Sequence, residues 1–262
     1  MITSTSNAKV KYLVNLKKKR KERDKENVFL VEGIRMFREV PADKLKEVYV
    51  SESFYKKEKS LADEIAGRSK KRVEILADNV FSHVSDTMTP QGVLCVVEQM
   101  NYSLESVLAN GKVPHLMVLD NLQDPGNLGT IVRTAEGAGV TGIIMSKETV
   151  DIYNPKVIRS TMGSIYRMPF YYADDLLAAI DEMKKRNIST YAAHLDGKHS
   201  YDEENYQNPC AFFIGNEGNG LRDEIADAAD IYIRIPMCGQ VESLNAAVAA
   251  CVLMFEAARQ RR

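Results

Sequence analysis

Polar side chains and glycines gather in three short segments of the second half of the chain, residues 120–129, 215–220 and 235–245, and each segment follows an apolar run. Amide, carboxylate, hydroxyl and guanidinium groups can orient a polar substrate, and glycines let backbone approach a ligand closely. We therefore interpret the three segments as parts of one site. Its candidate residues are Asn127, Arg133, Glu217, Ser243 and Asn245.

Each segment also has a purely structural interpretation. Asn127 and Ser243 are both of types that cap helices, and Asn245 is a second candidate cap or an exposed amide. The glycines of 215–220 match neither the dinucleotide fingerprint nor a phosphate loop, so they alone indicate only a glycine-rich turn. The functional interpretation depends on the coincidence of all three segments in one domain.

The elements that must position these residues alternate between buried strands and amphipathic helices. Such alternation predicts a mostly parallel sheet covered on both faces, with ligands bound beyond the carboxyl ends of the strands. The expected strands are LMVLD (116–120), GIIMS (142–146), STYAAHL (189–195), CAFFIG (210–215) and IYIRIP (231–236). The expected helices cover about 127–138, 155–162, 174–186, 221–228 and 243–259, with a mixed segment up to Ala173.

The first 100 residues form a second α/β series. We expect strands at 27–33, 46–51, 72–76 and 92–99, with helices up to Arg38 and over 54–68. This pattern predicts a small α/β domain at 1–105, and the larger sheet belongs to a domain at 112–262.

The net charge of −1 hides a difference between these regions. Residues 1–100 carry a formal charge of +5 and the remainder carries −6. Much of the positive excess follows an apolar helix pattern at Val10, Leu13, Val14 and Leu16. This basic segment is either a solvated helix face or a patch that binds phosphates. It consists of Lys17, Lys18, Lys19, Arg20, Lys21, Arg23 and Lys25.

Composition excludes several classes of protein. The 45% hydrophobic residues, with 15 Gly and 8 Pro, are typical of a globular chain. No segment has the pattern of a secretory signal or a membrane span, so we expect a cytoplasmic protein with no membrane association. The four cysteines form no CxxC pair, which argues against disulfides and against a metal site.

At the three segments the chain resembles the SpoU, or TrmH-type, branch of the SPOUT RNA methyltransferases. The motifs that carry the resemblance are N-x-x-D-P-x-N-x-G-x-x-x-R-T-A at 121–135, G-x-E-G-x-G at 215–220 and I-P-M-x-G-x-x-x-S-L-N at 235–245. They lie in the family's order and cover the second half of the chain. NVFLVEGIRMFREV and SDTMTPQGVLCVV are weaker marks of the small domain that often precedes it.

The resemblance implies a fold that periodicity cannot show. The parallel α/β domain of this family contains a deep trefoil knot, which binds S-adenosylmethionine, and the family forms homodimers. The small domain looks like a ribosomal protein L30e-type fold that grips RNA. The residues that the resemblance assigns to the cofactor are Leu195, Gly215, Ile235, Gly239 and Leu244.

The implied reaction transfers the cofactor's methyl group to a ribose 2′-hydroxyl of RNA. By resemblance, Asn127, Arg133, Glu217, Ser243 and Asn245 form the catalytic and substrate-holding set. Arg133 is the family's candidate for activating the hydroxyl, but a guanidinium is a poor general base, so we prefer a role in binding the adjacent phosphate and stabilising the oxygen. We expect Glu217 to fix either Arg133 or a neighbouring amide.

The fused small domain favours ribosomal RNA as the substrate. The alternatives are tRNA ribose methylation, a non-catalytic RNA-binding or ribosome-assembly protein of the same fold, and methylation of a tRNA base. A nicotinamide-dependent oxidoreductase is disfavoured because the dinucleotide fingerprint is missing.

Overall fold

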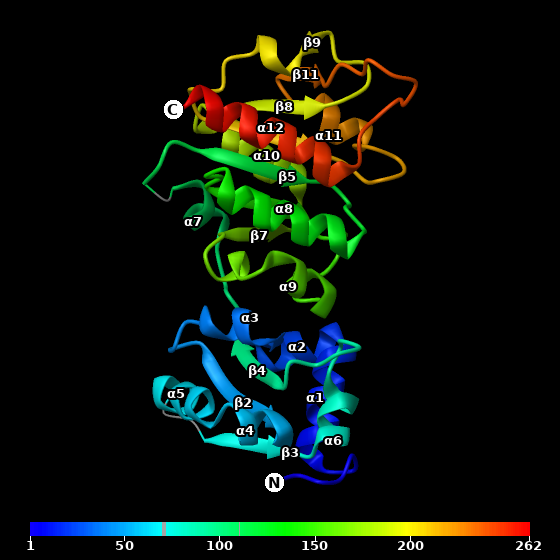
Figure 1. The fold of residues 1–262 in the computed structure, drawn as a ribbon. Coiled ribbons are helices and arrows are strands. Elements are labelled where there is room, and N and C mark those ends of the chain that lie inside the picture. The colour runs from blue at the N-terminus through cyan, green and yellow to red at the C-terminus, as the bar shows by residue number, and fades with distance from the viewer. Residues whose placement is uncertain (70–71, 110) are drawn as a thin grey trace. The chain divides into compact units, whose positions relative to one another are not determined.

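The chain folds into two compact units (Figure 1). The computed structural model describes residues 1–69, 72–109 and 111–262. The first unit contains Met1–Met100 and Asp151–Tyr166, and the second contains Asn101–Val150 and Arg167–Arg262. The segment Asp151–Tyr166, which the sequence placed in the larger domain, thus packs with the smaller one. It adds Lys156, Arg159 and Asp151 to the first unit, which raises the formal charge of that unit from +5 to +6.

The first unit is built on a mixed sheet in the order β1-β4-β2-β3. Strands β1 and β2 both run antiparallel to β4, so their carboxyl ends and the start of β4 lie at the same edge. The strands are β1 (Val28–Glu32), β2 (Leu45–Ser51), β3 (Val73–Leu76) and β4 (Val93–Glu98). The helices are α1 (Ala8–Lys18), α2 (Arg20–Glu26), α3 (Ile34–Arg38), α4 (Glu52–Lys57), α5 (Lys59–Ser69), α6 (Asp78–Val84) and α9 (Pro155–Thr161).

The basic segment lies across the junction of α1 and α2. Val10, Leu13 and Leu16 are buried on one face of α1, as their spacing predicts. The helix breaks at Lys19, whose backbone is extended. Arg23, which the sequence placed in the basic segment, is instead buried and is not available to a phosphate. It donates to the carbonyl oxygen of Leu16 at 2.6 Å, which ties the two helices together.

Buried polar contacts hold Asp151–Tyr166 within the first unit. Arg23 forms an ion pair with Asp151 at 2.5 Å, with both side chains nearly inaccessible to solvent. The Tyr153 hydroxyl accepts from the backbone N–H of Met100 at 2.7 Å and donates to its carbonyl oxygen at 2.8 Å. These contacts explain why a segment between two strands of the other unit belongs here.

The second unit contains a seven-stranded sheet whose paired strands are all parallel, in the order β7-β6-β5-β10-β8-β11-β9. This confirms the expected α/β class, whereas the trefoil knot stays a prediction. The strands are β5 (His115–Leu119), β6 (Gly142–Ser146), β7 (Phe170–Ala173), β8 (Ser189–Ala193), β9 (His199–Ser200), β10 (Cys210–Ile214) and β11 (Ile231–Arg234).

Helices cover this sheet. Residues of α7, α10 and α11 share one apolar core with Val118, Ile144 and Phe213 of the strands. Helices α8 and α12 pack against each other in front of the sheet in the view of Figure 1, and α12 also packs on β10. The helices are α7 (Leu104–Leu108), α8 (Pro125–Gly137), α10 (Leu176–Lys185), α11 (Asp223–Asp227) and α12 (Ala246–Gln260), with a short 3-10 turn at Tyr201–Glu203. Another 3-10 turn, Ser164–Tyr166, belongs to the first unit.

All four cysteines are free. In the described part of the chain, no helix is long and apolar enough to cross a membrane, and no cluster of three or more potential ligand side chains could hold a metal ion.

Candidate active site at the carboxyl ends of β5, β10 and β11

Three loops of the second unit meet at one edge of its sheet. Strands β5 and β10 are neighbours, β8 separates β10 from β11, and all four are parallel, so the loops that follow β5, β10 and β11 emerge on the same side. A cavity of about 690 Å³, here called the loop cavity, lies among the loops after β8, β10 and β11 and the start of α12. Predicted residues that line it are Leu195, Gly215, Glu217, Ile235, Ser243 and Leu244.

One chain of hydrogen bonds joins the three predicted loops. The Asn245 side-chain nitrogen donates to Asn127 Oδ1 at 3.0 Å, and Asn127 Nδ2 donates to Glu217 Oε1 at 2.9 Å. These partners are 118 and 90 residues apart in sequence. The sequence grouped the residues in one site, and the structure brings them into direct contact.

Glu217 also accepts from the loop after β5. The backbone N–H groups of Gln123 and Asp124 donate to its two carboxylate oxygens at 3.0 and 2.8 Å. Partial burial raises the pKa of Glu217, but the hydrogen bonds from Asn127, Gln123 and Asp124 outweigh it and hold the pKa below its ordinary value. Glu217 therefore stays ionised at neutral pH and fixes the amide, the second of the two expected partners.

The helix caps differ from two of the sequence interpretations. Helix α8 begins at Pro125, and its N-cap is Asp124, whose carboxylate accepts from the N–H of Asn127 at 2.9 Å. Asn127 is therefore inside the first turn, which leaves its side chain available to Glu217 and Asn245. The N-cap of α12 is Asn245, not Ser243, and its Oδ1 accepts from Ala247 N and Val248 N. Ser243 is exposed on the cavity wall.

Two glycines of the loop 215–220 are required by the conformation of the loop itself. A Cβ on Gly215 would lie 2.1 Å from the backbone carbon of Gly220, because the two ends of the loop form a β-bridge between Asn216 and Gly220. Gly220 has a φ of +71°, which favours glycine. By contrast, a Cβ on Gly218 would meet nothing closer than the Asn216 side chain at 3.6 Å.

Arg133 lies apart from this network. It is exposed on α8, six residues or about 9 Å along the helix axis from Asn127. Within the described residues its guanidinium has no hydrogen bond or ion pair, and it does not line the loop cavity. The expected contact with Glu217 is therefore absent from this structure. Gly239 also lies outside the cavity lining.

Two further contacts between these loops were not predicted from the sequence. Asp120 is fully buried at the end of β5, and Arg222 donates to it from Nε at 3.0 Å and from the guanidinium NH2 at 2.6 Å. Asn216 donates from its amide to the carbonyl oxygen of Asn121 at 2.9 Å. Both contacts tie the β10 loop to the β5 loop, and a carboxylate directly after a buried strand was a signal for the first.

The basic segment makes mixed contacts. Lys17 donates from Nζ to the carbonyl oxygens of Ser85 at 2.8 Å and His83 at 3.2 Å, so part of its bonding is structural. Arg20 forms an ion pair with Asp24 at 3.4 Å. Lys18, Lys19 and Lys21 are exposed, and their side chains have no partner among the described residues.

Comparisons with known proteins agree with this geometry. The chain matches the SpoU rRNA Methylase family over residues 114–255 and the MRM3-like substrate binding domain over residues 7–95. It is 34% identical over 255 residues to the 23S rRNA (guanosine(2553)-2'-O)-methyltransferase RlmP of Bacillus subtilis, with 97% of each chain covered.

Solved structures match nearly the full length of this chain. The SpoU methyltransferase AviRb from Streptomyces viridochromogenes, in complex with the cofactor AdoMet, superposes with a TM-score of 0.88 at 26% identity and covers 97% of this chain and 98% of its own. An AdoMet-bound rRNA methyltransferase from Sinorhizobium meliloti gives a TM-score of 0.81 at 30% identity, with 98% and 97% covered. The resemblance in the three motifs is thereby confirmed, and this chain belongs to the SpoU rRNA methylase family.

Proposed function

We propose that this chain transfers a methyl group from S-adenosylmethionine to a ribose 2′-hydroxyl of ribosomal RNA, in the cytoplasm. The observation that carries the proposal is the hydrogen-bonded chain Glu217–Asn127–Asn245, which locks all three family motifs together beside the loop cavity. The RlmP relative, whose name specifies 2′-O-methylation of 23S rRNA, supports the same substrate class.

The loop cavity fits the cofactor in size and charge. Its volume of about 690 Å³ lies in the range of small-molecule sites. Carboxylates of Asp196, Glu217 and Glu242 line it against the single arginine Arg234, which suits a cationic sulfonium. Leu195, Gly215, Ile235 and Leu244 would hold the cofactor, and Gly239 would act through the loop that it shares with them.

The bound cofactor would supply a methyl carbon on a positively charged sulfur, so the protein must align the ribose oxygen and help it lose a proton. Asn127, Glu217 and Asn245 hold the loops in place for that alignment, and Ser243 offers a hydroxyl at the cavity wall. Arg133, whose guanidinium is a poor general base, binds the phosphate next to the target ribose and stabilises negative charge on the oxygen.

RNA recognition belongs in this proposal to the first unit. Its formal charge is positive, and Lys18, Lys19 and Lys21, which are exposed and have no partner among the described residues, can contact phosphates, with Lys17 and Arg20 beside them. The match of residues 7–95 to a substrate binding domain supports this division of labour.

A homodimer completes the proposal. Helix α12 exposes Val248 and Phe255, 48% and 42% accessible, seven residues apart on one face, with the half-buried Val252 between them. A second copy packing on this face would cover the stripe. Replacing Val248 and Phe255 by Glu should shift the protein from dimer to monomer in light scattering after gel filtration, and an unchanged mass would contradict this assignment.

The activity is tested with labelled cofactor and separate transcripts of 23S rRNA and tRNA. Alkaline hydrolysis of the product leaves the bond next to a 2′-O-methyl ribose intact, so label should appear in an alkali-resistant dinucleotide from rRNA. Label on a base, or in tRNA alone, contradicts the proposed reaction or substrate. Absence of transfer together with RNA binding would support the alternative of a non-catalytic assembly protein.

A further inference from the structure

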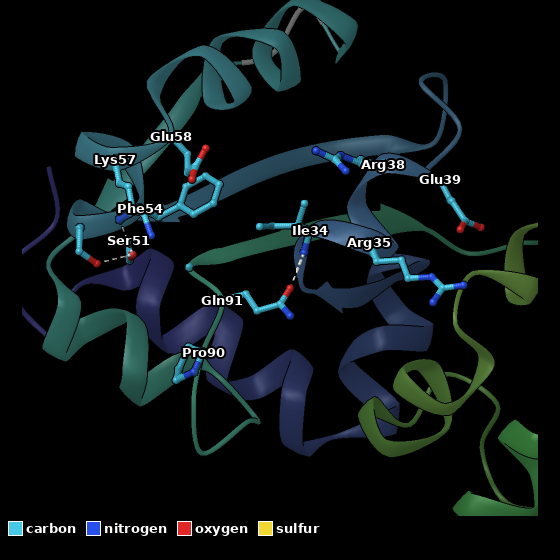
Figure 2. A pocket seen from close by; sticks show the side chains of 12 residues that line it. Ile34, Arg35, Arg38, Glu39, Ser51, Phe54, Lys57, Glu58, Pro90 and Gln91 are labelled. Carbon is cyan, nitrogen blue, oxygen red and sulfur yellow. Dashed lines mark hydrogen bonds between the residues drawn. The ribbon is translucent and has the colours of Figure 1, made fainter.

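The first unit has its own loop cluster, which does not include the basic segment. Because β1 and β2 both run antiparallel to β4, the helices after β1 and β2 meet the loop before β4 at one edge of the sheet. Between them lies an open cavity of about 780 Å³, here called the small-domain pocket (Figure 2). Its lining includes Ile34, Arg35, Arg38, Phe54, Lys57 and Gln91.

Backbone geometry holds this pocket in shape. Gly92 has a φ of +84°, and a Cβ there would lie 2.6 Å from Phe54 Cβ, so only glycine lets the loop pass this close to α4. Gln91 Oε1 accepts from the backbone N–H of Ile34 at 3.0 Å, which fastens the loop to the start of α3. Both contacts are made within the protein and position Gln91 at the pocket.

Several polar groups of the pocket remain available. Within the described part of the chain, the side chains of Arg35 and Lys57 and the amide nitrogen of Gln91 have no partner. The Arg38 side chain extends over the pocket on the side of Phe54 in Figure 2.

Two carboxylates, those of Glu39 and Glu58, also line the pocket, so cations outnumber anions by three to two. Glu39 Oε2 is directed at Gly163, where a Cβ would approach it to 2.0 Å, and Figure 2 shows this carboxylate pointing away from Gln91. In the same view of Figure 2, Gln91 lies between Lys57 on one side and Arg35 on the other, so cations flank the amide from two sides.

Apolar surface lies beside these cations. Ile34 and Pro90 are half-buried in the lining, and Met88, in the same loop as Gln91, is fully exposed at 100%. A ligand that suits this combination has a negative group for the cations, a planar face for the apolar side chains and a hydrogen-bond acceptor for the Gln91 amide. A nucleotide has all three.

We propose that the small-domain pocket holds an unpaired nucleotide of the RNA substrate. Lys57 and Arg35 contact its phosphates, and the Gln91 amide donates to an acceptor on the base edge. In an A-form duplex the bases are stacked and their edges are hard to reach, so the nucleotide must come from a loop, a bulge or a single strand. This inference rests on the proposed function, because it assigns to that RNA a second contact that selects sequence.

The test pairs two neighbouring lysines of α4. Lys57 lines the pocket, whereas Lys56 is 72% exposed, forms an ion pair with Glu52 and does not line it. Lys57→Gln and Lys56→Gln thus remove the same charge from the same helix. We expect Lys57→Gln to weaken binding of oligo(A), oligo(C) and oligo(U), measured by fluorescence anisotropy, by about fivefold and to lower the salt slope by about one, with a smaller effect from Lys56→Gln.

A second variant examines the base contact. Gln91→Glu keeps an oxygen for the Ile34 N–H and removes the amide donor. We expect it to reduce the preference of the protein among the three oligonucleotides, whereas a purely electrostatic effect would weaken all three by the same factor. Equal effects of the two lysine variants, unaltered preference in Gln91→Glu, or equally tight binding of a blunt duplex would overturn the proposal.

Free nucleotides are then tested as competitors of oligonucleotide binding. If AMP, CMP or UMP competes as well as the matching oligonucleotide, the pocket serves free nucleotides and the assignment to RNA is wrong. Methyl transfer is measured in parallel. If the enzyme is active and its KM for RNA is unchanged by Lys57→Gln and Gln91→Glu, only the assignment of a nucleotide to the pocket is wrong. If the chain transfers no methyl group but the two substitutions weaken its RNA binding, only the proposed methyl transfer is wrong.

Discussion

The two loop clusters of this chain, each at one edge of a sheet, use their polar groups in opposite ways. At the loop cavity, Asn127, Glu217 and Asn245 bind one another and the backbone. At the small-domain pocket, Arg35 and Lys57 have no partner among the described residues. The first arrangement fixes a geometry, as alignment of a methyl group with an oxygen requires. The second arrangement leaves the charges of Arg35 and Lys57 available to an RNA, of which one nucleotide would enter the pocket.

The difference predicts where substitutions act. In the first cluster a change should disturb several loops together and impair cofactor binding and catalysis. In the second it should alter RNA affinity and its salt dependence and leave cofactor binding intact.

The largest effect should follow Gly215→Ala. The new Cβ would collide with the backbone of Gly220 and Leu221 at 2.1 Å, and backbone cannot move aside as a flexible side chain can. We expect a loss of stability of about 3 kcal/mol and at least a tenfold loss of cofactor affinity, measured by thermal unfolding and calorimetry.

Gly218→Ala is the matched control for Gly215→Ala, since its Cβ would lie 3.6 Å from the nearest atom. Comparable damage from both variants would show that the loop is fragile throughout and would weaken the assignment of a fixed geometry to this cluster.

Arg133→Ala comes next and is the exception within the second unit, because Arg133 is exposed and unpartnered in the described structure. We expect methyl transfer to fall about a hundredfold with stability and cofactor affinity unchanged, as for loss of a group that stabilises a developing charge. Arg133→Lys should recover part of the rate. A large fall in melting temperature would instead assign Arg133 to the fold.

Much of this architecture could be predicted from the sequence, because buried parallel strands are continuous apolar runs. The exceptions have physical causes. Strand β7 was not predicted because its two central tyrosines are only half-buried, so it lacks a continuous apolar run. Strand β9 was not predicted because it is only two residues long. The cap of α8 was assigned to Asn127, although Pro125 at the first helical position already favoured Asp124.

The side-chain pairs themselves could not be read from the sequence. Asn127, Glu217 and Asn245 were chosen by type and by family motif, but nothing in the spacing showed that they touch each other while Arg133 stands apart. Likewise, no periodic signal placed Asp151–Tyr166 with the first unit, because its ties are single contacts such as Arg23 with Asp151.

A smaller effect should follow Glu217→Gln, which puts an amide where three donors now meet a carboxylate. We expect a loss of about 2 kcal/mol at pH 7 and a lower cofactor affinity. Since folding lowers the pKa of Glu217, its contribution is complete above the ordinary carboxyl range and is lost as the pH falls through the folded pKa. The stability difference between the variant and the unmodified chain should therefore shrink as the pH falls below the ordinary carboxyl range.

The smallest effects are expected from substitutions of two neighbouring lysines of the first unit, and the two substitutions should differ in what they change. Lys17 donates to the carbonyl oxygens of His83 and Ser85, where α6 ends, whereas Lys18 is exposed and unpartnered within the described residues. Lys17→Met should cost about 1 kcal/mol of stability, because those carbonyl groups lose a charged donor. Lys18→Met should leave the melting temperature unchanged and weaken RNA binding about twofold at low salt, with the difference vanishing at high salt. If Lys18→Met has no effect on RNA binding, the basic segment is a solvated helix face, and the contrast between the two units depends on the small-domain pocket alone.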